Sequence, residues 1–456
     1  MNAQAAVAAL WRGVGLPADA LGWLELTGRD PVLPSSFAVG TAAQASLAAA
    51  GLSAASLWHL RGGQPQRVSV DMRAAAAEFL SERLLRVDGQ QPADPWDPIA
   101  GLYATADGFV RLHTNFSHHR SGVLALLGCG NDKTAVAEAL RGWQALAFEQ
   151  AAADAGLCVT ALRTAAEWQS SPHGQAVSDM PVLIDRIGDG PPEPLPPAAR
   201  PLAGLRVLDL TRIIAGPVCT RILAAHGSEV MLVTGPHLPS IPVLVMDTGR
   251  GKRSTQLDLR TEVGRTALAG LARGADVFVQ NYRPGGLASL GFGPAALAAL
   301  RPGIVAGSLS AYGEFGPWSD RRGFDSLTQT ASGFNADERD AAGSDAPRTL
   351  PCQALDHASG ALMAFGIMTA LQRRALEGGS WHVRVSLAAT GRWLRGLGRL
   401  TDGFTGSVPV FDDCLETTAT PFGAMTAVRH SVRLATTPAA WAYPAVPLGT
   451  HEAVWP

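Results

Sequence analysis

One aspartate, Asp356, stands just before a long apolar segment with helical spacing. This spacing places its carboxylate at or near a helix N-terminus, where free backbone N–H groups and the positive end of the helix dipole favour a negative charge. The carboxylate is either a helix cap or a nucleophile that attacks an electrophilic carbonyl carbon. The adjacent His357 invites interpretation as a partner base, but neighbours on a helix point about 100° apart. For His357 we therefore favour packing or a local hydrogen bond.

Other residue groups with chemical potential lie in loops. The basic turn Gly249–Arg253 resembles many solvated surface clusters, and Arg283 fits either a loop-fixing salt bridge or an anion ligand. The turn 214–217 would let a ligand approach the backbone closely, or it is a plain helix start with a proline in the first turn. The sequence alone leaves these alternatives open.

Several familiar chemistries are disfavoured. His113, His118 and His119 have no cysteine or acidic residue at metal-ligand spacing, so we predict a surface role for them rather than a metal site. Ser308 and Ser310 do not form a G-x-S-x-G elbow, which argues against a serine hydrolase. No G-x-G-x-x-G follows Leu210, so the usual dinucleotide fingerprint is absent.

Length and charge narrow the class of protein further. The chain has 456 residues, a formal net charge of −2 and 5 scattered cysteines without a C-x-x-C pair. The near-zero charge gives no electrostatic footprint for nucleic acid. The N-terminus does not resemble a signal peptide, and no apolar run is long enough to span a bilayer. We therefore expect a reduced, cytoplasmic protein that binds neither nucleic acid nor membrane.

The elements that must position Asp356 follow a proline-rich linker at 188–201. Short buried-type strands alternate there with helical runs, which predicts an α/β fold with a parallel sheet. Ligands bind beyond the carboxyl ends of such strands. We predict strands at 205–210, 229–233, 275–280 and 303–308, helices at 217–225 and 262–273, and ligand-facing loops at 211–217, 281–285 and 308–314.

The region before the linker has a different pattern. We predict one or two short helices in 1–30, a helix at 37–62, a strand at 66–70, a helix at 72–86, a hairpin at 101–113 with Asp-Gly at its turn, and mainly helix at 119–185.

A weak internal repeat links the two regions. When the sequence is aligned with itself at one fixed offset, Gly51 aligns with Gly366 and Val68 with Val383 without a gap. The same alignment pairs Thr41 with Asp356. The long helix, its Gly-Gly stop and the following strand would thus occur twice. On this interpretation the first copy lacks the carboxylate, and only the second can use it.

A series of motifs carries a family resemblance. They are 201–217 (PLAGLRVLDLTRIIAGP), 251–259 (GKRSTQLDL), 275–285 (ADVFVQNYRPG), 311–317 (AYGEFGP), 322–325 (RGFD) and 355–360 (LDHASG). In this order they resemble the class III CoA-transferases, the CaiB/BaiF family, over about 202–390. Residues 37–80 and 101–185 resemble later parts of the same family, which suggests a rearranged fusion with a partial N-terminal copy.

The resemblance implies a fold and a chemistry. The fold would be α/β, with a Rossmann-like large domain of parallel strands and a smaller α+β domain. The substrates would be an acyl-CoA and a free carboxylic acid, with no permanently bound cofactor. Asp356, at the position of the family's aspartate, would form a mixed anhydride and then an aspartyl-CoA thioester. The residues that would contact coenzyme A are Ile213, Ile214, Ala215, Arg250, Lys252, Arg253, Asn281, Tyr282, Arg283 and Tyr312.

We accordingly divide the chain into five parts. They are a partial copy without a nucleophile at 1–90, a small α+β domain at 91–187, the linker at 188–201, the catalytic domain at 202–400, and a tail at 401–456 that returns to the large domain. The family forms interlocked dimers, so we predict a homodimer.

Two alternative functions stay open. An α-methylacyl-CoA racemase of the same fold would need a His-Asp pair where this chain has Phe324 and Asp325, and Phe324 cannot carry a proton. A non-catalytic CoA-binding protein would suit the degenerate first copy, but Asp356 in the second copy argues against it.

Overall fold

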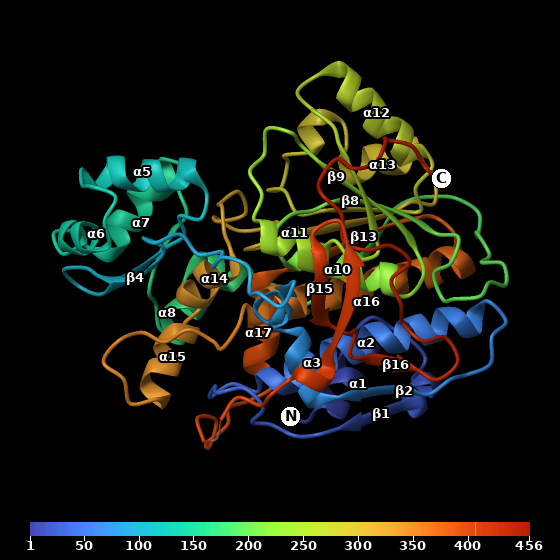
Figure 1. Cartoon of the computed structure of the whole chain (residues 1–456), viewed down its shortest axis with the longest axis horizontal. Helices are drawn as coiled ribbons and strands as arrows, with labels where there is room; N and C mark the ends of the chain where they lie inside the picture. Colours follow the sequence, from blue (N-terminus) through green and yellow to red (C-terminus); the bar gives the residue numbers. More distant parts are fainter. Residues whose placement is uncertain (406) are drawn as a thin grey trace.

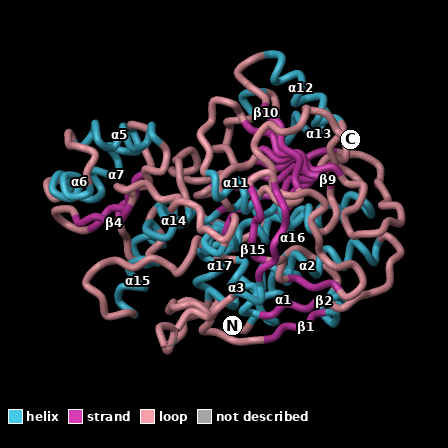
Figure 2. Tube along the Cα trace, viewed as in Figure 1, coloured by secondary structure: helices cyan, strands magenta, loops and turns pink. Residues whose placement is uncertain are grey.

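The computed structural model describes residues 1–405 and 407–456, and within them a seven-stranded sheet forms the centre of the molecule (Figures 1 and 2). All neighbouring pairs are parallel except the last, in which β7 runs antiparallel to β13. In spatial order the strands are β10 (Lys252–Gln256), β9 (Glu229–Thr234), β8 (Arg206–Leu210), β11 (Val277–Gln280), β12 (Val305–Ser310), β13 (Ser380–Ser386) and β7 (Leu183–Gly188).

The two faces of this sheet pack into different cores. Alternate strand residues point to opposite faces, so Val207 and Val277 join the main core while Leu208 and Phe278 join a second one. The helices α10 and α16 cover the first face, and α12 and α13 cover the second. Their bounds are α10 (Ala215–Ala225), α16 (Ala354–Glu377), α12 (Glu262–Arg273) and α13 (Pro294–Leu300).

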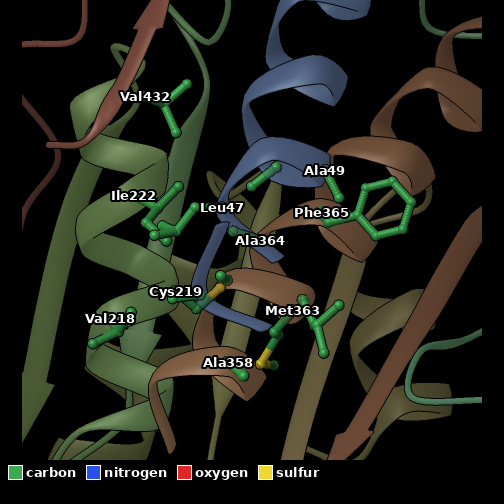
Figure 3. Close-up of a cluster of buried hydrophobic side chains, with 14 of the residues drawn as sticks. Leu47, Ala49, Val218, Cys219, Ile222, Ala358, Met363, Ala364, Phe365 and Val432 are labelled. Atoms are coloured by element: carbon green, nitrogen blue, oxygen red, sulfur yellow. The ribbon is translucent and has the colours of Figure 1, made fainter. Parts of the chain in front are cut away.

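Helix α16 is the central element of the main core. Among the described residues it is the one helix long and apolar enough to cross a membrane, yet its apolar window is entirely buried inside the protein. It packs against α10 and against the N-terminal helix α2 (Val39–Leu60). Figure 3 shows Leu47 of α2, Ile222 of α10 and Phe365 of α16 together in this cluster. The burial of these side chains joins the N-terminal block to the large domain.

The N-terminal block builds its own small sheet. Strand β2 pairs in parallel with β1 and antiparallel with β16, a strand from the C-terminal tail. The tail also forms the hairpin β14–β15, which pairs with β3. The elements are α1 (Ala3–Gly13), β1 (Leu24–Thr27), β2 (Val68–Asp71), α3 (Met72–Glu78), α4 (Ser81–Leu84), β3 (Arg86–Val87), β14 (Leu415–Thr420), β15 (Gly423–Val428) and β16 (Val432–Leu434).

A small domain lies to one side of the large sheet, at the left of Figure 1. Its antiparallel strands and helices enclose a separate core between Ile99 and Ala161. The elements are β4 (Gly101–Ala104), β5 (Phe109–Leu112), α5 (Ser117–Leu127), α6 (Lys133–Leu140), α7 (Ala145–Asp154) and β6 (Val159–Ala161). The remaining helices are α8 (Ala165–Ser170), α9 (Pro172–Ala176), α11 (Pro242–Thr248), α14 (Asp325–Ala331), α15 (Phe334–Ala341) and α17 (Leu387–Gly396).

The predicted α/β fold is confirmed, including the strand–helix alternation after the linker and the hairpin at 101–113. Three details differ from the prediction. Residues 183–188, assigned from sequence to the small domain and the linker, form edge strand β7 of the large sheet. The helix predicted at 72–86 is broken between α3 and α4. The tail contains strands that the sequence did not reveal, and it pairs with the N-terminal block as well as lying on the large domain.

Candidate active site

The topology of the sheet creates a crevice. The chain proceeds from β8 toward β9 and β10 in one direction and from β11 toward β12 and β13 in the other, so the strand order reverses between β8 and β11. Ligands bind beyond the carboxyl ends of strands at such a point. The loops there are locked together, because the Asn281 side chain accepts a hydrogen bond from the Arg212 N–H (3.0 Å) and donates one to the Arg212 carbonyl (2.7 Å).

The loop after β8 is strained where it enters this crevice. Ile213 has a φ of 73°, a left-handed conformation that is a genuine outlier for a β-branched residue. Strained residues of this kind cluster at functional sites, where the surrounding structure holds them. Helix α10 begins two residues later at Ala215, and its first N–H groups have no acceptor within the helix. The strain at Ile213 thus directs this helix N-terminus into the crevice.

Helices α10 and α16 meet at their N-termini because of one small residue. A Cβ atom added at Gly360 would lie 2.5 Å from the Ala215 carbonyl oxygen and 2.8 Å from the Val218 side chain. Only glycine permits this close approach. The contact brings Asp356, in the first turn of α16, next to the start of α10.

Asp356 is almost buried, with 8% of its surface exposed. Its backbone N–H donates to the Asp325 carboxylate at 2.9 Å, so Asp325 caps the helix and the Asp356 side chain is not needed for that purpose. Gln329 also donates to Asp325. The sequence offered two roles for Asp356, a helix cap or a nucleophile. Because the capping carboxylate comes from Asp325, the carboxylate of Asp356 is left available for chemistry.

The carboxylates of this site resist ionisation. Burial raises the pKa of Asp356 well above its usual value, and the nearby carboxylates of Asp325 and Glu82 raise it further. Burial also raises the pKa of Asp325 to about 6, although the hydrogen bonds from backbone N–H groups and Gln329 oppose this. A helix N-terminus favours an ionised carboxylate, but desolvation and like charges outweigh it here. Once ionised, such a basic carboxylate is a stronger nucleophile.

His357 turns away from Asp356 toward the N-terminal block. Its Nε2 atom lies 3.1 Å from Oε2 of Glu82, and its ring stacks on Phe79 at 5.4 Å between centroids. This agrees with the prediction of packing or a local hydrogen bond. Glu82 itself carried no signal in the sequence, because it lies in the short helix α4, far from Asp356 along the chain.

Two cavities meet at Asp356. The first, called the arginine cavity, has a volume of about 350 Å³. It contains Arg212, Arg283 and Arg322, as well as the predicted contacts Asn281 and Tyr282 and the start of α10 at Ala215. Three arginines line this cavity, and guanidinium groups favour phosphate oxygens, although that of Arg212 already donates to the Pro239 carbonyl. Arg212 and Arg322 were missed at the sequence level, although both lie within the motifs quoted for the family resemblance.

The second, called the connector cavity, has a volume of about 570 Å³. The turn-rich connector 91–96 and Glu82, Arg83, His113 and Asn115 from the N-terminal half form one wall. The opposite wall comes from α11 and the loop after β8. Four residues line both cavities, namely Ile213, Ile214, Phe324 and Asp356. Segments from both halves of the chain thus line both cavities.

The basic turn does not reach either cavity. Lys252 is buried, and its Nζ donates to Asp209 (3.0 Å) and to the Pro217 carbonyl (2.9 Å) beneath the start of α10. Arg250 is also buried, donates to Asp247 at 3.1 Å and lies over Trp441. Both side chains serve internal ion pairs, because they are buried against the rest of the protein, although β10 is an edge strand of the sheet.

Two further predicted contacts also lie elsewhere. Arg253 lies 4.0 Å from Glu229 on the neighbouring strand. Tyr312 is buried among the small domain's connections, with its hydroxyl 3.5 Å from the Thr160 hydroxyl and its ring against His173 and Trp318. Neither side chain contributes to the walls of the two cavities.

The surface role predicted for the three histidines is wrong for His113 and His119, which are buried, whereas His118 is exposed. His113 stacks on Phe324 with 3.8 Å between ring centroids, and His119 lies 3.8 Å from the Cys158 sulfur. Among the residues that the structure describes, no group of three or more His, Cys, Asp or Glu side chains is arranged to hold a metal ion.

Comparison with known proteins identifies the family. The model described as CoA-transferase family III matches residues 13–186 and 202–442. An acyl-CoA transferase of Gibberella moniliformis is 30% identical over 74% of this chain and 67% of its own length. The acetyl-coenzyme A transferase nodX of Hypoxylon pulicicidum is 36% identical over 52% of this chain and 42% of its own length. The probable fatty acyl-CoA transferase Rv3272 of Mycobacterium tuberculosis is 34% identical over 41% of this chain and 51% of its own length.

Matches to solved structures cover smaller parts. The crystal structure of Rv3272 from Mycobacterium tuberculosis matches 44% of this chain and 59% of its own with a TM-score of 0.40 at 32% identity. The crystal structure of a CAIB/BAIF family protein from Brucella suis matches 50% of this chain and 65% of its own, with a TM-score of 0.39 at 26% identity. The chain thus spans between about two fifths and two thirds of the length of the relatives named above. The family match covers both halves of the sequence, and the chain belongs to CoA-transferase family III.

Proposed function

We propose that the protein transfers coenzyme A between an acyl-CoA and a free carboxylic acid, with Asp356 as the nucleophile. The observation that carries this proposal is the meeting of the two cavities at one available carboxylate. Relatives named formyl-CoA:oxalate CoA-transferase and succinate–glutarate CoA-transferase support transfer of this general kind.

The steps follow from the chemistry of a carboxylate and a thioester. The ionised Asp356 carboxylate attacks the thioester carbonyl, which forms a mixed anhydride and releases the CoA thiolate. The thiolate attacks the Asp356 carbonyl of that anhydride, which gives an aspartyl-CoA thioester and a free carboxylic acid. The second acid repeats the sequence in reverse and leaves as a new acyl-CoA. Two difficult exchanges are thus divided into easier covalent steps.

The protein supplies electrostatic help at two places. Backbone N–H groups at the start of α10, near Ala215, are suited to stabilise the oxyanion that develops on the attacked carbonyl. Arg212, Arg283 and Arg322 are suited to bind the phosphates of coenzyme A, in place of the basic turn expected from sequence. Binding at these remote groups positions the thioester for attack.

Trapping of the intermediate tests the proposal. The protein is incubated with a panel of acyl-CoAs, treated with hydroxylamine or borohydride, and digested for mass spectrometry. Modification confined to the peptide that contains Asp356 is the expected result, and the Asp356→Asn variant should show none. An unmodified protein across a broad panel, without exchange of label between acid and thioester, would reject the transferase.

The racemase alternative has one observation on its side. His113 lines the connector cavity with Asp356 and stacks on Phe324, so it is placed to substitute for the histidine that Phe324 replaces. Burial, however, lowers the pKa of His113 to about 3, which makes it a poor base. Deuterium uptake at the α-carbon of a 2-methylacyl-CoA without an adduct on Asp356 would favour the racemase.

Three further expectations from sequence stay predictions. They are the homodimer, the cytoplasmic location and the lack of a permanently bound cofactor. Comparison of the mass in solution with specific activity on dilution tests the homodimer.

A further inference from the structure

We infer that the connector cavity binds the acyl group of the substrate, that it accepts a neutral apolar acyl group, and that it selects against an acyl group with a second carboxylate. This inference rests on the proposed function and adds the substrate class to it. It depends on three properties of the cavity, which are its position, its apolar surface and its charge.

Position assigns the two cavities to the two ends of an acyl-CoA. The thioester carbonyl must lie at Asp356, where the cavities meet. The phosphates of the CoA moiety are drawn to the arginine cavity with Arg212, Arg283 and Arg322. The acyl chain leaves the thioester carbon in the other direction, which is the connector cavity.

The surface of the connector cavity is suited to hydrocarbon. Seven large apolar residues contribute to its walls, namely Trp96, Ile213, Ile214, Ile241, Val243, Leu244 and Phe324. Trp96 is held in place by His113 at 5.7 Å between ring centroids and by the Arg111 guanidinium at 5.2 Å. A volume of about 570 Å³ lies within the usual range for small-molecule sites, about 300–1000 Å³. The cavity is therefore larger than an acetyl or formyl group requires.

The charges in this cavity oppose a second carboxylate. Besides the proposed nucleophile Asp356, the carboxyl groups of Glu82, Asp94 and Asp325 line it, and Arg83 is its one cationic side chain. The Arg83 guanidinium already donates to the Pro351 carbonyl at 2.6 Å and lies 3.5 Å from Glu82. A distal carboxylate would thus enter an acidic environment in which the one guanidinium is already bonded. Like charges at close range disfavour binding and so contribute to specificity.

Acid exchange measures this preference directly. Each acyl-CoA is mixed with its own isotope-labelled free acid, and mass spectrometry follows the label into the thioester, so the donor and acceptor are always matched. Octanoyl-CoA and phenylacetyl-CoA should exchange with kcat/KM at least about tenfold above succinyl-CoA and glutaryl-CoA. Equal or faster exchange of the dicarboxylic esters would overturn the inference and leave the transferase proposal intact.

A charge introduced into the cavity sharpens the test. Ile241 is partly exposed at the start of α11, so Ile241→Lys should fold, with Ile241→Gln as a neutral control of similar length. We expect Ile241→Lys to raise glutaryl-CoA exchange and lower octanoyl-CoA exchange, so that their ratio changes by at least about tenfold relative to Ile241→Gln. Ratios that are the same in the two folded variants would contradict the assignment of this cavity to the acyl group.

Binding separates failure of the inference from failure of the proposed function. If no ester exchanges and Asp356 is never modified, the transferase proposal fails. Calorimetry with octanoyl-CoA, glutaryl-CoA and free CoA then still decides the cavity. Tighter binding of octanoyl-CoA than of glutaryl-CoA supports the inference, whereas equal or weaker binding rejects it.

Discussion

The first turns of helices α2 and α16 have the same backbone but different chemistry. The residues that precede them, Ala38 and Gln353, have φ and ψ values of −77° and 62° and of −76° and 63°. In each helix a carboxylate from outside accepts from first-turn N–H groups, Asp30 at α2 and Asp325 at α16. One helix presents Thr41 and the other presents Asp356 at the corresponding position.

The correspondence extends along both helices. A Cβ atom at Gly51 would meet Val68 of β2 at 3.3 Å, and one at Gly366 would meet Val383 of β13 at 2.6 Å. These are the pairs that the sequence repeat aligns. Each helix therefore packs on its following strand through a glycine at the same register. This geometry supports the proposal that residues 1–90 are a partial copy of the catalytic domain.

The two helices differ in whether the side chain of their third residue, Thr41 or Asp356, donates a hydrogen bond to the capping carboxylate. The Thr41 hydroxyl donates to Asp30 at 2.7 Å, so it completes the cap. A carboxylate at the equivalent place, Asp356, cannot donate when ionised and faces the like charges of Asp325 and Glu82. The same backbone frame thus gives a completed cap at Thr41 and a carboxyl group with a raised pKa at Asp356.

The largest expected effect is loss of activity in Asp356→Asn. Asn keeps the size and the helix start but cannot form the anhydride, so kcat should fall by about a thousandfold or more. Thermal stability at neutral pH should not fall, because a buried carboxylate with a raised pKa is removed. CoA exchange kinetics and a melting curve measure both. Thr41→Val is the matched control and should retain activity; a folded Asp356→Asn protein with substantial exchange would show that Asp356 is not the nucleophile.

The reverse exchange, Thr41→Asp, should damage the fold without creating a site. The new carboxylate would face the partly buried Asp30, which now accepts a hydrogen bond from the Thr41 hydroxyl, at a position where Thr41 is buried. Loss of that hydrogen bond and burial of a second charge should lower the free energy of unfolding by about 1–3 kcal/mol. Urea denaturation measures the change. Trapping with acyl-CoA should modify Asp356 alone, and an adduct at position 41 would contradict the distinction between the copies.

A smaller effect is expected on the pH dependence of catalysis. The nucleophile must be ionised, so kcat/KM should rise with pH as Asp356 loses its proton. Glu82 contributes to the raised pKa of Asp356, so Glu82→Gln should lower that pKa and move the rising limb to lower pH. A pH–rate profile measures the position of this limb. The control is Glu377→Gln, which removes an exposed carboxylate at the far end of α16, the helix that also carries Asp356. An unmoved limb in Glu82→Gln would mean that the titrating group lies elsewhere.

The sequence revealed those features that depend on local pattern. Alternating apolar strands and helical runs predicted the sheet, and the position of Asp356 before an apolar segment predicted its place in the first turn of a helix. The repeat that pairs Gly51 with Gly366 could be found because glycine at a close helix–strand contact leaves a sequence mark.

The features that escaped prediction depend on tertiary contacts. Glu82 and Trp96 reach the site only because the N-terminal half folds back over α16, and no local pattern signals such a long-range contact. Lys252 looked like an exposed phosphate ligand, but its side chain is buried although β10 is an edge strand, and its charge is paired with Asp209. A cluster of basic residues does not show whether its partners are solvent, ligand or another part of the chain.

The smallest effect concerns the capping carboxylate itself. The pKa of Asp325 is raised to about 6 in the folded protein, above the value of 3.8 expected for an unfolded chain. The folded state therefore holds the proton more tightly, so this group's contribution to stability is full below about pH 4 and is lost as the pH rises through about 6. In Asp325→Asn the amide oxygen can still accept from the Asp356 N–H, while the proton-linked loss disappears. The free energy of unfolding of this variant, relative to the unchanged protein, should increase between pH 4 and pH 7. Denaturation curves at the two pH values measure this, with Asp320→Asn as a surface control for the loss of one charge. A relative stability that stays constant or falls over this range would show that hydrogen bonds, rather than burial, dominate at Asp325, and the contrast between the two helix caps would then rest on Asp356 alone.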